Sequence, residues 1–69
     1  MNKNELRAVM IAYGDTYETL AEALGIYAST LSNKINNKNG IGFNQPEIIA
    51  IKNRYNLTAD QIDRIFFAS

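Results

Sequence analysis

Residues 17–36, YETLAEALGIYASTLSNKIN, constrain the fold of this 69-residue chain more than any other stretch. Apolar side chains recur at spacings of three and four residues in each half of the stretch, as on the buried face of a helix. Gly25 stands between the halves, where glycine commonly ends a helix in the left-handed conformation. The pattern predicts two short helices joined by a tight turn. The apolar positions are Leu20, Ala21 and Leu24 in the first half and Leu31 and Ile35 in the second.

Helix-starting signatures recur along the chain. A short polar residue followed three positions later by Glu or Gln forms a capping box, and this spacing occurs at 2–5, 44–47 and 58–61. Thr16 is a further N-cap candidate. No window alternates between apolar and polar residues, as a half-buried strand would. Helices are therefore expected over 2–13, 17–24, 28–36 and 45–55, and from 59 onward.

Composition excludes several kinds of function. The sequence has no Cys and no His, so it lacks thiolate and imidazole ligands and the commonest general base. We therefore predict no catalytic residue, metal site, cofactor or small-molecule substrate, and we do not expect an enzyme. No apolar run approaches the roughly 20 residues that span a bilayer, and the N-terminal residues lack a signal-peptide core. A single cytoplasmic domain over residues 1–69, without a membrane partner, is expected.

The charge balance limits any interaction with nucleic acid. Seven Lys and Arg offset seven Asp and Glu, so the formal net charge is zero. Neutralisation of phosphates dominates non-specific DNA affinity, and many DNA-binding domains are clearly basic. A DNA-binding function would therefore require the few cations to gather on one face, or would give weak binding.

Residues 17–35 resemble the helix-turn-helix domains of the phage lambda-repressor and Cro type. Leu20 and Ala21 match the apolar and small positions of the family's second helix, and 24–26 match its turn. Residues 29–32 match the opening of its recognition helix, and Ile35 matches the last core position. The resemblance extends over nearly the whole chain, because the capped helices that follow also fit the family.

The resemblance implies an all-α, lambda-repressor-like domain of five short helices, with the helix-turn-helix at the second and third. It also implies a regulator of the switch between lysogenic and lytic growth in a bacterial host. The chain is similar to the small proteins that oppose the repressor in temperate lactococcal phages. Some of these are Cro-like, and others modulate repression by pairing with the repressor.

The third helix would then enter the major groove of operator DNA. An Asn side chain there can bond adenine bidentately, and an Ala methyl can contact a thymine methyl. Capping by Ser29 or Thr30 and a solvated polar face at Asn33 are the ordinary alternatives for those residues. The residues expected nearest base edges are Tyr27, Ala28, Ser29, Thr30 and Asn33, and those expected near phosphates are Thr16, Tyr17, Lys34 and Lys38.

A protein-binding function is the alternative hypothesis. Ile49, Phe66 and Phe67 are more apolar side chains than one small core easily buries, and an exposed apolar cluster marks a partner surface. The partner would be the cognate phage repressor or a second copy of this chain. Ordinary core packing is the alternative interpretation of these three residues.

Overall fold

The computed structural model describes residues 2–36 and 42–67. Within them it contains five α-helices, one π-helical segment and no strand, so the all-α prediction is confirmed for this part of the chain. None of the described helices is long and apolar enough to cross a membrane. The elements are α1 (Lys3–Ala12), α2 (Tyr17–Leu24), α3 (Ala28–Asn36), α4 (Gln45–Tyr55), α5 (Ala59–Ile62) and the π-helix η2 (Asp63–Phe67).

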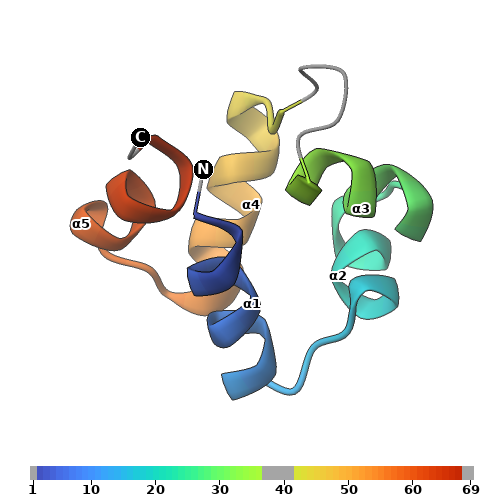
Figure 1. Ribbon diagram of the computed structural model, residues 1–69, viewed down its shortest axis with the longest axis horizontal. Coiled ribbons are helices and arrows are strands. Elements are labelled where there is room, and N and C mark those ends of the chain that lie inside the picture. The colour runs from blue at the N-terminus through green and yellow to red at the C-terminus, as the bar shows by residue number, and fades with distance from the viewer. Residues whose placement is uncertain (1, 37–41, 68–69) are drawn as a thin grey trace.

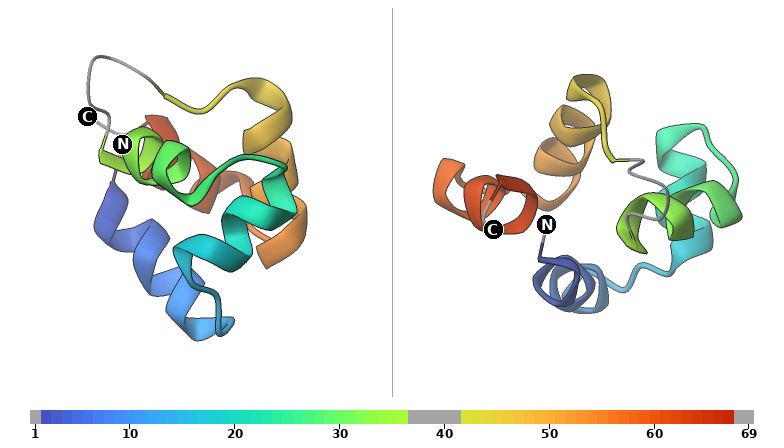
Figure 2. Two further views of the ribbon diagram at one scale, coloured as in Figure 1. Left: turned by 90° about the vertical axis from the view of Figure 1, so that its right-hand side faces the viewer. Right: turned by 45° about the horizontal axis from the view of Figure 1, so that its top comes forward.

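The helices form two groups around a central pair. Helices α1 and α4 lie in the middle of Figure 1, with α5 and η2 on one side and α2 and α3 on the other. In the left view of Figure 2, α2 and α3 face the viewer, α1 and α4 lie on opposite sides, and the C-terminal helical segments lie behind. The buried side chains come from all three parts and form a single core. The core consists of Leu6, Met10, Leu20, Ala21, Leu31, Ile35, Ile51, Tyr55, Leu57 and Ile65.

Three helices begin with complete capping boxes, of which the sequence predicts those at Asn44 and Thr58 and only the N-cap at Thr16. Thr16, Asn44 and Thr58 each accept a backbone N–H three residues on, at 3.2, 2.9 and 3.2 Å. The third residue of each box returns a bond to the backbone N–H of the cap. At Thr16 the returning group is the Thr19 hydroxyl. Because these bonds satisfy orphan helix donors, they define where α2, α4 and α5 begin.

The start of α1 differs from its prediction. The Asn2 side chain accepts the Glu5 N–H at 3.1 Å, which is half of a capping box. The other half is absent, because the Asn2 N–H donates to the Ile65 carbonyl at 2.7 Å and the Glu5 carboxylate binds Arg64 at 3.0 Å. Both groups that could have closed a local box therefore join α1 to η2 instead.

The turn after α2 follows the sequence pattern. Gly25 has φ of +72°, in the left-handed region that glycine adopts at low cost. The Ile26 N–H donates to the Ala21 carbonyl at 3.0 Å, which closes the end of α2. The chain turns at once into α3, and α2 and α3 pack against each other.

The C-terminal segment is not the regular α-helix that its apolar spacing predicts. After Ile62 the chain continues as η2, in which each turn is wider than an α-helical turn. Ile65 is fully buried, Phe66 is half-buried and Phe67 is 61% exposed. Phe66 packs edge-on against Phe43, with ring centroids 5.5 Å apart.

Candidate nucleic-acid interface

The solvent-exposed face of α3 carries polar side chains. Ser29 and Asn33 are exposed, and Thr30 is half-buried on the same helix. Tyr27, which precedes the helix, is 82% exposed. Ala28 is partly buried against the core, so its methyl group is less available to a partner than the sequence suggests. Leu31 and Ile35 point into the core and hold this face outward.

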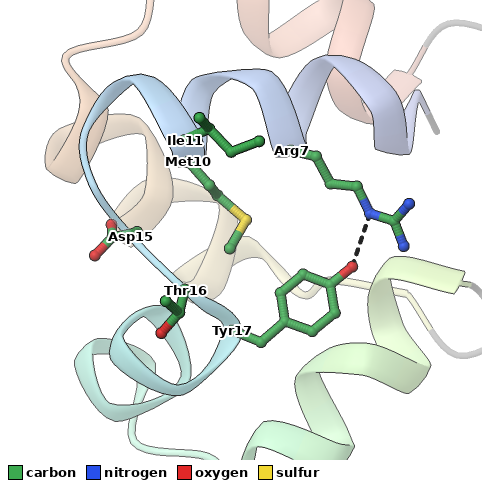
Figure 3. Close-up of a pocket in the computed structure, with 6 residues that line it drawn as sticks. All are labelled: Arg7, Met10, Ile11, Asp15, Thr16 and Tyr17. Atoms are coloured by element: carbon green, nitrogen blue, oxygen red, sulfur yellow. Dashed lines mark hydrogen bonds between the residues drawn. The ribbon is translucent and has the colours of Figure 1, made fainter.

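The first residue of α2 contacts α1. The Tyr17 hydroxyl accepts a hydrogen bond from Arg7 Nε at 2.8 Å (Figure 3), and the guanidinium carbon lies 5.9 Å from the Tyr17 ring centroid. A phenol hydroxyl that accepts one bond still has its own hydrogen to donate. Tyr17 and Arg7 therefore present an O–H donor and guanidinium N–H groups side by side. Thr16, beside them, uses its hydroxyl oxygen to cap α2.

A half-open hollow of about 210 Å³ lies between α1 and the start of α2. Its lining is mostly apolar, and the Arg7–Tyr17 hydrogen bond closes one edge of it (Figure 3). The residues that line it are Arg7, Met10, Ile11, Asp15, Thr16 and Tyr17.

Two cations of α1 border the α2–α3 pair. Lys3 and Arg7 are four residues apart, so they lie on one face of α1. Lys3 Nζ donates to Asn36 Oδ1 at 3.4 Å at the end of α3, and Arg7 reaches Tyr17 at the start of α2. Within residues 2–36 and 42–67 neither cation forms an ion pair with a carboxylate. Neither Lys3 nor Arg7 was among the residues expected near phosphates, although their helical spacing is visible in the sequence.

Lys34, expected to bind a phosphate, is engaged within the protein. Its Nζ lies 3.2 Å from Glu47 Oε1 and donates to the Gly42 carbonyl at 3.3 Å. The side chains of Lys34 and Glu47 are only 13% and 11% exposed. Lys38, the other expected phosphate contact from this region, lies outside the described residues.

Arg54 and Arg64 are also ion-paired. Arg64 binds Glu5, and Arg54 binds Asp15 through two nitrogens, at 2.8 and 2.7 Å. Asp15 also accepts the Tyr55 hydroxyl at 2.6 Å. Burial, and then the hydrogen bond to Asp15, raise the pKa of Tyr55 above its usual range, so the hydroxyl stays protonated and donates. This network joins the α1–α2 link to α4.

The three apolar side chains expected at a partner surface are in different environments. Ile49 is 53% exposed on α4, and Phe67 is 61% exposed at the end of η2. Phe66 packs against the core and Phe43, so it contributes less apolar surface than its neighbours.

Comparisons of the chain with protein-family models, with curated proteins and with solved structures give no match.

Proposed function

We propose that this protein is a small DNA-binding regulator of the helix-turn-helix type. In this proposal α2 and α3 form the motif, and the exposed face of α3 enters the major groove of operator DNA. The regulated process would be a phage switch between lysogenic and lytic growth, as the resemblance implies. The packing of α2 on α3 and the left-handed Gly25 between them support this assignment.

One observation carries the proposal. Lys3 and Arg7, which form no ion pair in the described part of the chain, border the neutral polar face of α3. From α1, the Lys3 ammonium group reaches the end of α3, and the Arg7 guanidinium group reaches the Tyr17 hydroxyl at the start of α2. Phosphate contacts position a protein on DNA, and contacts from α3 to base edges would provide specificity. The zero net charge is therefore compatible with DNA binding, because these two cations belong to one edge of the motif.

The expected salt dependence is small. Each neutralised phosphate contributes a slope of about −0.9 to the dependence of log K on log salt. We expect roughly two to four contacts per monomer, of which Lys3 and Arg7 provide two, and hence a slope of roughly −2 to −4. Glu18 and Glu22 are exposed on α2 and add no attraction for DNA.

The test is fluorescence anisotropy with a duplex selected from a randomised library, at about 50 to 200 mM salt. Arg7→Gln and Lys3→Gln should each weaken binding and make the slope shallower by about 0.9. Lys52→Gln is the matched control, because Lys52 is an exposed cation on α4. Asn33→Ala should relax specificity at one adenine by about 1–3 kcal/mol. Failure of the wild-type protein to bind any duplex at low salt would refute the proposal.

A second candidate function is pairing with another regulatory protein, and the exposure of Ile49 and Phe67 favours it. In this case the protein would act as an antirepressor that binds the cognate phage repressor. Size-exclusion chromatography with the regulator encoded beside it would test the pairing. Ile49→Ser and Phe67→Ser should abolish a complex, whereas Ile11→Ser, at a 76% exposed position on α1, should not.

A further inference from the structure

Lys34 is the only cation in the sequence of α3, and it is directed toward α4. Its ammonium group is held by the Glu47 carboxylate at 3.2 Å and by the Gly42 carbonyl at 3.3 Å. Glu47 is itself fixed, because its Oε1 also accepts the Asn44 N–H at 3.0 Å in the capping box of α4. The ion pair is therefore part of the junction between α3 and the start of α4.

The position of Lys34 along α3 gives the pair a consequence for DNA binding. Lys34 follows the exposed Asn33 and lies one turn beyond Thr30, at the C-terminal end of the polar face. Its four-carbon stem is flexible, so an unpaired ammonium group at this position would extend toward a phosphate beside the end of the helix. In the structure, Glu47 competes for that ammonium group.

The competition favours Glu47. Moving the Lys34 ammonium group to a phosphate would exchange one anionic partner for another, so the attraction that it experiences would increase little. It would also leave the Glu47 carboxylate, whose side chain is 11% exposed, without a counter-charge. Removing one member of a largely buried ion pair is strongly unfavourable, because the other charge remains uncompensated.

We propose that Glu47 lowers the DNA affinity of this protein by holding Lys34 away from the phosphate backbone. The inference rests on the DNA-binding function proposed above and assigns Glu47 a role in it. Glu47 then determines how many phosphates the motif neutralises. Loss of its charge converts Lys34 into an additional phosphate contact.

The decisive variant is Glu47→Gln. Glutamine also functions at the third position of a capping box, so the bonds at Asn44 are retained while the charge is removed. We expect tighter binding to the selected duplex and a salt slope steeper by about 0.9 than that of the wild type. The advantage over the wild type should therefore shrink about 3.5-fold between 50 and 200 mM salt.

Two further variants separate this effect from a general change in charge. Asp60→Asn removes an exposed acid of α5, which has no ion pair among the described residues, and it should give no steeper slope. In a Lys34→Met background, Glu47→Gln should give no gain in affinity. Circular dichroism should first establish that each variant is folded.

The outcomes distinguish the two proposals. If the wild type binds DNA and Glu47→Gln leaves the slope unchanged, this inference fails and the proposed function stands. The inference also fails if the gain in affinity persists in the Lys34→Met background. If the wild type binds no duplex at low salt, the proposed function fails and this inference fails with it.

Faster acylation of Lys34 in free Glu47→Gln protein, measured by mass spectrometry, would support release of the ammonium group independently of DNA.

Discussion

Replacing Asp15 by alanine tests the network that holds the α1–α2 link against α4. The Asp15 carboxylate accepts bonds from Arg54, from the Tyr55 hydroxyl and from the Thr19 hydroxyl, and its side chain is only 8% exposed. In Asp15→Ala these donors lose their acceptor. Arg54 is 37% exposed and Thr19 lies at the surface, so water can replace Asp15 for both. Tyr55 is 2% exposed, and water cannot readily reach its hydroxyl.

The unsatisfied Tyr55 hydroxyl determines how much stability the Asp15→Ala variant loses. A buried polar group left without a partner costs about 1–3 kcal/mol. A domain of 69 residues has a free energy of unfolding of roughly 3–10 kcal/mol, so this loss is a large fraction of it. For a domain of this size, the loss corresponds to a fall in Tm of about 5–20 °C.

The assay is thermal and urea unfolding, followed by far-UV circular dichroism. Glu22→Ala, at an exposed position of α2, is the control and should change stability by less than about 0.5 kcal/mol. Asp15→Ala should cost less in a Tyr55→Phe background, where no hydroxyl is left unsatisfied. The reasoning is refuted if Asp15→Ala matches the control, or if its cost is the same in both backgrounds.

The same network predicts a dependence on pH. The hydrogen bonds from Arg54 hold the pKa of Asp15 well below its ordinary value of 3.8, against the effect of burial and with help from Tyr55 and Thr19. A depressed pKa in the folded state contributes stability above the unfolded pKa, and this contribution is lost as pH falls toward the folded value. The stability difference between the wild type and Asp15→Asn should stay constant from about pH 7 to 5 and shrink below about pH 4.

Three smaller effects follow from single contacts. Gly25→Ala should destabilise the fold by roughly 1–2 kcal/mol in urea unfolding, because φ is +72° at this residue. Gly42→Ala, at a residue outside the left-handed region, should cost less, and equal costs would contradict this reasoning. Tyr13→Phe removes the hydroxyl that donates to the Tyr55 carbonyl at 2.9 Å, and calorimetry should record a loss of about 0.5–1.5 kcal/mol rather than none. Arg64→Gln breaks the ion pair with Glu5 at the surface and should lower the free energy of unfolding by less than about 1 kcal/mol. Salt screens such pairs, so a loss of stability that persists in about 1 M salt would contradict this explanation.

The starts of three helices could be predicted from the sequence because their causes are local. The caps at Thr16, Asn44 and Thr58 each join residues three positions apart, so the residue types and the spacing contain all the necessary information. The left-handed Gly25 was predictable for the same reason, since it ends the helix that directly precedes it.

The contacts that join different helices could not be predicted in this way. Asp15 directly precedes α2, but its main partner, Arg54, is 39 residues away in the sequence. Arg7 was overlooked because only the packing of α1 on α2 brings it to Tyr17. Lys34 was expected to point outward, and its pairing with Glu47 depends on how α3 meets α4.

The backbone bond from the Asn2 N–H to the Ile65 carbonyl makes one amide a reporter for both ends of the fold. Amide protons near a chain terminus ordinarily exchange with solvent quickly, because termini fray at low free-energy cost. Protection of the Asn2 amide would therefore measure how often η2 separates from α1. Compared with protection of amides within α4, it would reveal whether the C-terminal segment opens by itself or only when the whole domain unfolds.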